Sequence, residues 1–351
     1  MAVSINGTSG LTFNDGTSVG TASSLGMRNR IINGAMEIDQ RNAGASVTPT
    51  AGVYTLDRWS AVLTQASKFS VQQNAGSVTP PAGFTNYLGV TSLSSYSVLS
   101  SDTFMVEQLI EGFNFSDTAF GTASAKTITI SFWARSSLTG TFGGSICNES
   151  GARDYPFSYT LSSANTWTQV SITVPGDTTG TWLTTNGTGA RVRFGLGSGS
   201  TYTGTANAWG TVNAVQPTGT VSVVGTNGAT FYLTGVQLEV GSVATPFERR
   251  LYGQELALCQ RYYQYWGGST NVFQLRGYNL TAGALTQTIT YPVSFRTSPT
   301  VSIGTVTYSN ASGLAVQGNE RQGLMTVSVT ASGDAYVTSS GTNKITFSAE
   351  L

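Results

Sequence analysis

Short runs in which apolar and polar residues alternate recur along residues 26–250. Alternation with a period of two places the apolar side chains of a β-strand on one face of a sheet. The pattern is clearest in residues 128–135, 167–174, 191–196 and 231–240. The side chains predicted to face a core are Ile128, Ile130, Phe132, Ala134, Val170, Ile172, Val174, Val192, Phe194, Leu196, Leu233, Val236 and Leu238. The side chains predicted to face outward are Thr129, Ser131, Trp133, Arg135, Arg191 and Arg193.

Breaks in this pattern indicate how the strands are connected. The apolar phase shifts between Leu233 and Val236, and Gly235 at the shift predicts a β-bulge. Clusters of Gly, Ser, Thr and Asn, as at 184–189 and 197–205, separate the runs. Many short strands with polar turns predict an all-β protein, in which residues 26–250 form an antiparallel jelly-roll β-sandwich.

Residues 251–268 have a different character and predict one connecting α-helix. Good helix formers run from Gln254 to Trp266, and Gly267 and Gly268 follow as a stop signal. A 4-3-4-3 stripe, typical of a coiled-coil seam, is formed by Tyr252, Leu256, Cys259, Tyr263 and Trp266. Two hypotheses remain open: the stripe is a trimer interface at a three-fold axis, or the helix lies against its own sandwich.

The two ends of the chain differ from the middle. Residues 1–25 read as an arm, in which the turn signal at 14–16 separates two short apolar pieces. This arm is too small to bury a core and is expected to pack on another chain or protein. Residues 269–351 return to strand patterns at 284–295, 300–308, 324–330 and 344–351, with Pro292 disfavouring a central strand. They predict a smaller C-terminal β-domain.

Charge is scarce in this chain and is evenly balanced. Charged residues make up 10% of the sequence, against about 25% in typical soluble domains. Lys plus Arg and Asp plus Glu number 17 each, and there is no basic stripe. The sequence therefore predicts no nucleic-acid partner, and recognition through hydrogen bonds and aromatic faces.

Composition also limits the chemistry. The chain has no histidine, which excludes His-dependent nucleophilic triads and His-ligated metal sites. Its two cysteines, Cys147 and Cys259, are expected to be unpaired buried residues. The N-terminus has no apolar signal region and no stretch reaches about 18 apolar residues, so we expect no membrane insertion and synthesis in a cytoplasm without secretion.

Several segments resemble phage tail-fibre proteins that carry carbohydrate-binding-module jelly rolls. Residues 30–37 (RIINGAME) and 56–59 (LDRW) resemble the opening of such a domain, and residues 130–136 (ISFWARS), Trp167 and 174–182 its middle. The most specific matches are residues 229–241 (ATFYLTGVQLEVG), 244–250 (ATPFERR) and 256–263 (LALCQRYY). Residues 7–17 resemble the attachment segments of tail appendages.

The resemblance implies a virion tail-fibre subunit, usually a homotrimer, that contacts host surface polysaccharide. Residues 1–25 would attach it to another virion tail or baseplate protein. Some relatives hold calcium through an opening Glu and an Asp in the last strand. Glu37 matches the Glu, but Thr234 and Gly235 stand where the Asp is expected, so no metal or other cofactor is predicted.

Aromatic residues outside the predicted core are the candidate sugar contacts. Trp133 and Arg135 share the outward face of one strand, where a ring and a guanidinium can bind a sugar together. Trp182, Tyr202 and Trp209 lie in Gly- and Thr-rich loops. The alternative for all five is structural, under a neighbouring loop or protomer or as loop anchors. Trp59 is assigned to the core.

An enzyme is the alternative function. Glycoside hydrolysis uses two carboxylates, and the pairs Glu107 with Glu111 and Glu149 with Asp154 are available. No motif distinguishes these pairs from chance, so the sequence predicts a structural adhesin and not an enzyme. A free bacterial lectin, the third hypothesis, is disfavoured by the missing signal peptide.

Overall fold

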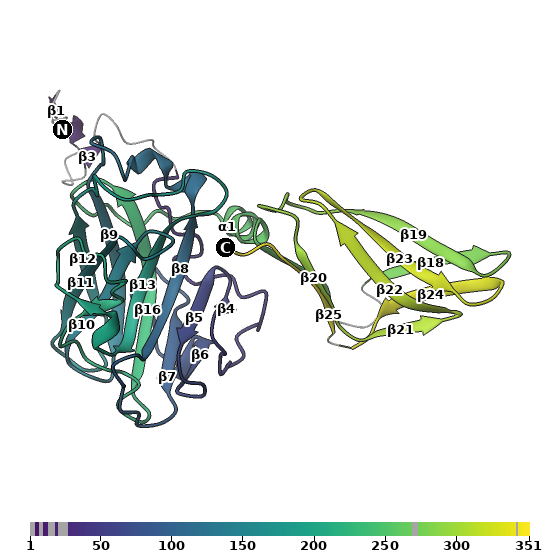
Figure 1. Ribbon diagram of the computed structural model, residues 1–351, viewed down its shortest axis with the longest axis horizontal. Helices are drawn as coiled ribbons and strands as arrows, with labels where there is room; N and C mark the ends of the chain where they lie inside the picture. The colour runs from purple at the N-terminus through teal and green to yellow at the C-terminus, as the bar shows by residue number, and fades with distance from the viewer. Residues whose placement is uncertain (1–3, 7–9, 13–17, 20–26, 269–272, 342) are drawn as a thin grey trace.

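The computed structural model describes all residues except 1–3, 7–9, 13–17, 20–26, 269–272 and 342. A large β-sandwich is joined by helix α1 (Tyr252–Gln260) to an elongated C-terminal β-domain (Figure 1). The all-β fold class is confirmed. The predicted arm falls largely outside the described residues, and its described parts form a small antiparallel sheet of β1 (Ser4–Asn6), β2 (Gly10–Thr12) and β3 (Ser18–Val19).

The sandwich consists of two antiparallel sheets between which the chain passes repeatedly, as in a jelly roll. The six-stranded sheet has the order β11 (Asp154–Leu161), β10 (Gly140–Cys147), β13 (Thr188–Ser198), β8 (Thr103–Glu111), β5 (Trp59–Leu63), β4 (Val53–Leu56). The five-stranded sheet has the order β12 (Thr168–Val174), β9 (Ile128–Ser136), β16 (Thr230–Val240), β7 (Leu88–Ser92), β6 (Phe69–Gln73). The connections contain η1 (Ala75–Ser77), η2 (Gly112–Asn114), η3 (Ser116–Thr118), η4 (Ser200–Tyr202) and the parallel pair β14 (Thr203–Gly204) and β15 (Gln216–Pro217).

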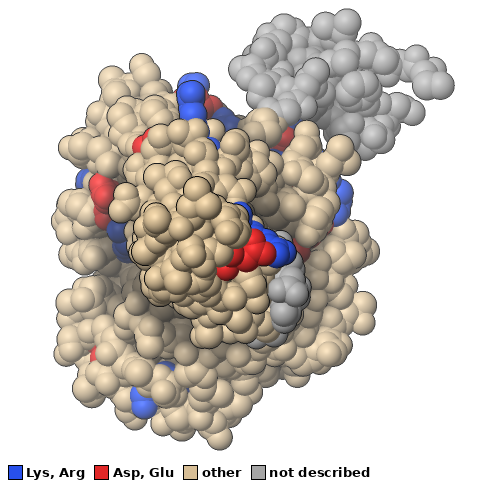
Figure 2. All heavy atoms as spheres, turned by 90° about the vertical axis from the view of Figure 1, so that its right-hand side faces the viewer, with Lys and Arg blue, Asp and Glu red and all other residues tan. Residues whose placement is uncertain are grey.

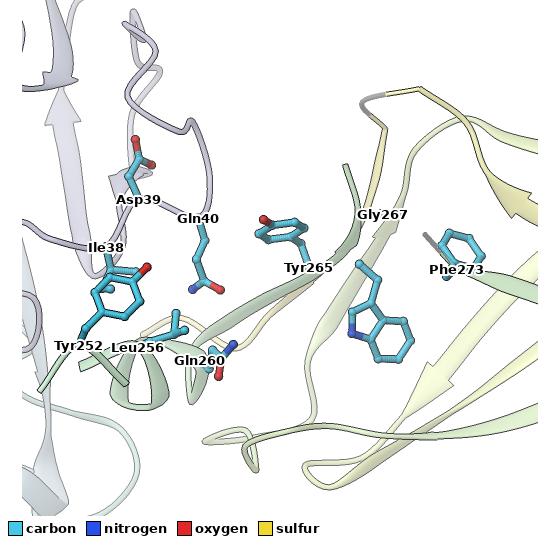
Figure 3. A pocket seen from close by; sticks show the side chains of 10 residues that line it. Ile38, Asp39, Gln40, Tyr252, Leu256, Gln260, Tyr265, Gly267 and Phe273 are labelled. Carbon is cyan, nitrogen blue, oxygen red and sulfur yellow. The ribbon is translucent and has the colours of Figure 1, made fainter. Parts of the chain in front are cut away.

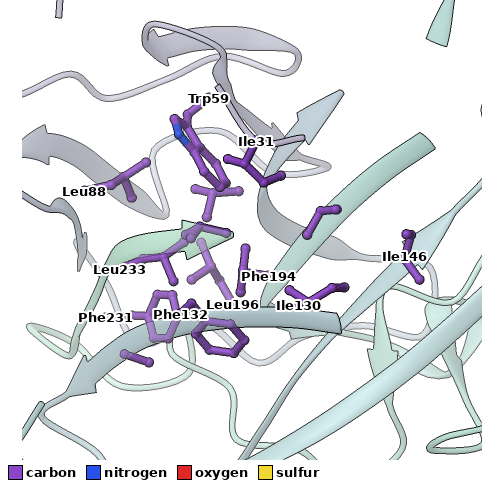
Figure 4. Packing of buried hydrophobic residues seen from close by; sticks show 14 of the residues in the cluster. Ile31, Trp59, Leu88, Ile130, Phe132, Ile146, Phe194, Leu196, Phe231 and Leu233 are labelled. Carbon is purple, nitrogen blue, oxygen red and sulfur yellow. The ribbon is translucent and has the colours of Figure 1, made fainter. Parts of the chain in front are cut away.

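The main core lies between the two sheets (Figure 4). Every side chain predicted to face it is buried there except Ile172, which is partly buried. Trp59 is fully buried, with its ring centroid 6.1 Å from that of Phe194. Burial of one large apolar side chain contributes about 1.5–3 kcal/mol, so this cluster provides the main stabilisation of the sandwich.

The β-bulge predicted at Gly235 is present. The register between β16 and β9 shifts between Thr234 and Gln237, and Gly235 has a φ of 61°. A Cβ at this position would lie 2.6 Å from the ring of Phe84. Glycine is therefore required both by the left-handed backbone and by the close approach of Phe84.

The outward faces of the sheets are less exposed than the alternation predicted. Arg193 is 3% exposed, with its Nε 3.4 Å from Glu107 and its Nη1 2.7 Å from Asn213 Oδ1. Thr129 and Ser131 are also buried. These three residues were predicted to face outward, and their burial shows that the outer faces are partly covered: Arg193 contacts Asn213 and Thr129 donates to the carbonyl of Gly241. Alternation does not reveal such coverage.

The predicted helix is too long. It ends at Gln260, and residues from Tyr263 onward form β17 (Tyr263–Gly267), which pairs with β25 (Lys344–Ser348). Tyr and Trp favour strands, and β25 offers this segment backbone partners. Cys259 and Tyr263 are buried within the chain, with Cys259 packed beside Ile32. The five-residue helical seam is therefore wrong, and α1 lies against its own sandwich.

The C-terminal domain contains three small antiparallel sheets. Their orders are β17–β25–β20 (Thr300–Ile303), β18 (Gln274–Asn279)–β24 (Gly333–Ser339)–β21 (Val306–Ser309), and β19 (Gly283–Thr290)–β23 (Gln322–Val329)–β22 (Ala311–Gly318). The run predicted at 284–295 ends before Pro292, and the run at 300–308 is two strands separated at Gly304. Strands β18, β22 and β24 had not been predicted.

The sandwich and the C-terminal domain are joined by buried ion pairs. Glu350 accepts hydrogen bonds from Arg41 and from Arg58, whose side chain is 1% exposed. The guanidinium of Arg58 lies 3.6 Å from the ring centroid of Tyr262. Breaking a buried ion pair costs free energy, so these pairs hold the two domains in a fixed relative position. A site at the junction of the domains would therefore keep its shape without a ligand. Among the described residues, no helix is long and apolar enough to cross a membrane.

Candidate functional site

The loop residue Trp182 belongs to an aromatic cluster inside the sandwich. It is 7% exposed, and its ring centroid lies 5.6 Å from Phe115 and 4.9 Å from Phe120. Its Nε1 donates a hydrogen bond of 3.1 Å to Asp177. Trp182 is therefore buried with its indole N–H already paired, which matches the loop-anchoring alternative and leaves little of the ring accessible to a sugar.

Trp209 and Tyr202 are half-buried in the loop region that follows β13. Trp209 donates its Nε1 to the carbonyl of Pro175 at 3.0 Å, and its ring centroid is 5.2 Å from that of Tyr155. Tyr202 ends the short η4 turn. These contacts match the loop-anchoring alternative for Trp209, and a sugar contact at either residue stays a prediction.

Trp133 and Arg135 are both half-buried on β9. Arg135 donates its Nε to the carbonyl of Asn165 at 2.9 Å, and its guanidinium is 5.3 Å from the ring centroid of Tyr232. The side chain of Trp133 lies beside the Gly235 bulge. Arg135 is therefore engaged within the chain, and none of the five predicted sugar contacts lines the cavity described next.

A cavity of about 520 Å³ lies at the junction of the two domains (Figure 3). Three segments line it: the chain before β4, helix α1, and strand β17 with the residue that precedes β18. The lining residues are Ile38, Asp39, Gln40, Tyr252, Leu256, Gln260, Tyr265, Trp266, Gly267 and Phe273. Tyr252, Leu256 and Gln260 follow at intervals of four, which places them on one stripe of the helix.

Four aromatic residues line this cavity: Tyr252, Tyr265, Trp266 and Phe273. Tyr252 is 61% exposed and Tyr265 is 36% exposed. Lys344 holds Tyr265 in place, since its Nζ lies 4.0 Å from the ring centroid and donates to the carbonyl of Gln40 at 2.9 Å. Trp266 is braced by Phe347, with ring centroids 4.7 Å apart. The rings of Tyr265 and Trp266 are thus held in position by contacts within the chain.

Gln40 supplies a fixed polar group. Its Nε2 donates to Asp57 Oδ1 at 2.6 Å and to the carbonyl of Tyr263 at 3.2 Å. Its Oε1 has no hydrogen-bond partner among the described residues, so the orientation of the amide leaves an acceptor for a ligand. Asp57 also accepts from the backbone N–H of Gln40 at 2.7 Å. Burial raises the pKa of Asp57 to about 6, although Arg41 and Gln40 oppose this shift.

Two further polar residues, Asp39 and Gln260, line the same space, and the carboxylate of Asp39 points away from Gln260 in Figure 3. Asp39 accepts the backbone N–H groups of Asn42 at 2.9 Å and Gly44 at 2.7 Å, which fixes its carboxylate. The side-chain amide of Gln260 makes no hydrogen bond with any described residue. Rings that stack on the apolar face of a sugar, together with fixed acceptors for its hydroxyls, suit carbohydrate binding.

Of the carboxylate pairs considered for hydrolysis, Glu107 and Glu111 are engaged in structure, whereas Glu149 is exposed and Asp154 is buried. Glu107 lies within 3.6 Å of Arg191 and 3.4 Å of Arg193. Burial acts to raise the pKa of Glu111, but hydrogen bonds from Arg261 and Tyr262 hold it below its usual value. In the part of the chain that is described, no three acidic or cysteine side chains gather in a way that could hold a metal ion. Cys147 and Cys259 are free and buried, as predicted.

Sequence reasoning found part of the junction cavity for the wrong reason. Tyr252, Leu256 and Trp266 were singled out as parts of a helical trimer seam, and the structure places all three in the lining of the cavity. Asp39, Gln40 and Tyr265 were missed. The cluster of aromatic residues before Gly267 and Gly268 could have indicated a binding surface. These residues form such a surface only because β17 pairs with β25, and the sequence does not reveal that pairing.

Neither a protein-family model nor a curated protein matches this sequence. Several solved structures are similar over part of this chain. The enzymatically active domain of tailspike protein 4 of bacteriophage CBA120 is 11% identical over 61% of this chain and 22% of the tailspike chain, with a TM-score of 0.33. A putative sugar binding protein from Bacteroides thetaiotaomicron is 13% identical over 61% of this chain and all of its own length, with a TM-score of 0.34.

A third similar structure is TmCBM61 in complex with β-1,4-galactotriose, at 12% identity and a TM-score of 0.30, over 61% of this chain and 99% of that one. These likenesses are too weak to assign a family. The fold is defined by the sheets described above, and the function is argued from the junction cavity.

Proposed function

We propose that this chain is a structural subunit of a phage tail fibre that adheres to host-cell surface glycan through the junction cavity. The observation that carries the proposal is the combination, in one cavity, of the braced ring of Tyr265, the exposed ring of Tyr252 and the fixed side-chain amide of Gln40. Among the described residues that line the cavity, Asp39 is the single carboxylate. Glycoside hydrolysis uses two, so the lining favours binding over cleavage.

The remaining parts of the proposal rest on the sequence resemblance. The fibre is a homotrimer located on the virion, and residues 1–25 attach it to a tail or baseplate protein. One sugar site of this kind binds weakly, because a single stacked ring contributes about 0.5–1.5 kcal/mol. Three copies in one fibre raise the effective concentration of sites, which converts weak contacts into stable adhesion.

Substitutions at the exposed rings test the proposal. In Tyr252→Ala and Tyr265→Ala fibres, retention of purified host polysaccharide should weaken about fivefold for each lost ring, which corresponds to about 1 kcal/mol. Tyr278→Ala is the matched control, because Tyr278 is 64% exposed on the same domain and does not line the cavity.

Two outcomes would contradict the proposal. Normal retention by both cavity variants would show that glycan binds elsewhere or not at all. Progressive shortening of the polysaccharide by the wild-type protein, followed by gel filtration, would establish a depolymerase instead of an adhesin.

A further inference from the structure

A second cavity adjoins the junction cavity on the C-terminal domain. It has a volume of about 440 Å³ and is lined by Trp266, Phe273, Gln274, Gln287, Thr288, Ile289, Thr290 and Met325. Trp266 and Phe273 line both cavities, so the two spaces are neighbours on either side of these two residues.

The second cavity presents free amide groups above an apolar floor. Gln274 lies on β18 and Gln287 on β19, and both side chains are exposed. Neither side-chain amide has a hydrogen-bond partner among the described residues. Met325 is 3% exposed and lies opposite Gln287 in the register of β19 and β23. Amides can both donate to and accept from sugar hydroxyls, which suits a polyhydroxylated chain.

Charge is nearly absent from both cavities. Among the described residues that line either of them, Asp39 alone is charged. Figure 2 shows the end of the molecule formed by the C-terminal domain as largely uncharged, with one small group of acidic and basic side chains in front. Lys344 lies beside Tyr265, but its Nζ already donates to the carbonyl of Gln40 at 2.9 Å. No arginine or lysine is among the described lining residues, so an anionic ligand would find no free cation there, and burying an unpaired charge is unfavourable.

From this geometry we propose that the two cavities form one extended site, which binds a linear, uncharged polysaccharide along its length. The junction cavity takes one part of the polysaccharide by stacking on Tyr265. The following sugars pass Phe273 and hydrogen-bond with Gln274 and Gln287. This inference rests on the proposed function and adds to it the class of ligand and the direction in which the ligand runs.

Titration with oligosaccharides of graded length tests the extension. The probes are linear α-1,4-glucan, β-1,4-glucan and β-1,4-galactan series from disaccharide to hexasaccharide, with oligogalacturonate as the charged counterpart. For at least one neutral series, the affinity of the wild-type protein should rise about tenfold between disaccharide and hexasaccharide, or about 1.4 kcal/mol. The Gln274→Ala/Gln287→Ala variant should lose this increase and keep the affinity for the disaccharide.

Gln317→Ala is the control. Gln317 is an exposed amide aligned across the strands with Leu324 and Thr288, on the face of that sheet opposite Gln287 and Met325. The Gln317→Ala variant should show the same rise of affinity with oligosaccharide length as the wild-type protein.

The extension and the proposed function fail in different ways. Affinity that does not grow with length, or that the Gln274→Ala/Gln287→Ala variant retains in full, overturns the extended site while adhesion through Tyr265 stands. Preference for oligogalacturonate, or no binding to any neutral series at millimolar concentration, overturns the neutral class of ligand. Unchanged retention of host polysaccharide by both Tyr252→Ala and Tyr265→Ala overturns the proposed function itself.

Discussion

At the scale of single residues, Asp57 connects the interior of the sandwich to the junction cavity. It is 1% exposed and holds both the backbone N–H and the side-chain Nε2 of Gln40. Without this carboxyl group the Gln40 amide could rotate, and the acceptor that it presents to the cavity would no longer be fixed. A buried acid in this role carries an energetic cost, because burial disfavours its charged form.

This cost predicts a distinctive pH dependence. The pKa of Asp57 is raised from 3.8 to about 6, chiefly by burial, so the folded state binds its proton more tightly than the unfolded state. The resulting stabilisation is fully present below about pH 4 and is lost as the pH rises through about 6. Asparagine cannot ionise. The unfolding free energy of wild type minus that of Asp57→Asn should therefore fall by about 3 kcal/mol between about pH 4 and pH 7.

Chemical denaturation of both proteins across this range measures the difference. The altered hydrogen bond to the Gln40 backbone changes the unfolding free energy of Asp57→Asn by the same amount at every pH. The test is therefore how the difference between the two proteins changes with pH. A difference that stays flat across the range would mean that Asp57 is not buried as described.

The residue scale also shows which aromatic side chains could be assigned from sequence. Trp59 was placed in the core because it directly follows Asp57 and Arg58 near the start of a strand, and it is buried there. Trp182 and Tyr265 both lie near glycines, yet one is buried and the other exposed. Local sequence does not distinguish them, because Phe115 and Phe120, which cover Trp182, come from a distant part of the chain.

At the scale of elements, alternation identified the sandwich strands because both sheets bury one face in a common core. The Gly235 bulge was also predicted, since a phase shift leaves a visible mark in the sequence. The end of α1 was not predicted. Residues 261–266 have side chains that fit either a helix or a strand, and the choice is made by β25, more than 75 residues further along the chain.

The bulge gives a prediction with an internal control. Gly235→Ala forces a Cβ into a left-handed backbone, which costs about 1–2 kcal/mol, and brings it against Phe84. Gly228→Ala has a similar φ of 72° but no atom within 4 Å of the added Cβ. Thermal or chemical unfolding should therefore show a larger loss of stability for Gly235→Ala, and the excess measures the contact with Phe84. Equal losses would mean that Phe84 moves aside without cost.

At the scale of the whole molecule, the junction cavity exists only while the two domains keep their relative position. Tyr252 and Gln260 come from the connecting helix, Asp39 and Gln40 from the chain before β4, and Tyr265 from β17. The ion pairs of Glu350 with Arg41 and Arg58, and of Glu111 with Arg261, cross this junction. None of these pairs was predicted, because charges so distant in sequence give no local signal.

Glu350→Gln tests whether this junction depends on charge. The substitution keeps the shape of the side chain but leaves Arg58, which is 1% exposed, without its anionic partner. Breaking one side of a buried ion pair typically costs about 3–5 kcal/mol, because the remaining charge is buried and uncompensated. Asp334→Asn is the matched control: Asp334 pairs with Arg276 at 3.0 Å, but the two side chains are 64% and 58% exposed. An exposed pair contributes at most about 1 kcal/mol.

Two measurements on these variants separate stability from junction geometry. Chemical denaturation should show the larger loss for Glu350→Gln, together with a split into two transitions as the domains become uncoupled. Retention of host polysaccharide should fall in the same variant under conditions where both domains are still folded, since the cavity loses its shape when the domains move apart. Similar stability and retention in Glu350→Gln and Asp334→Asn would mean that packing alone, and not the buried ion pairs, holds the two domains together.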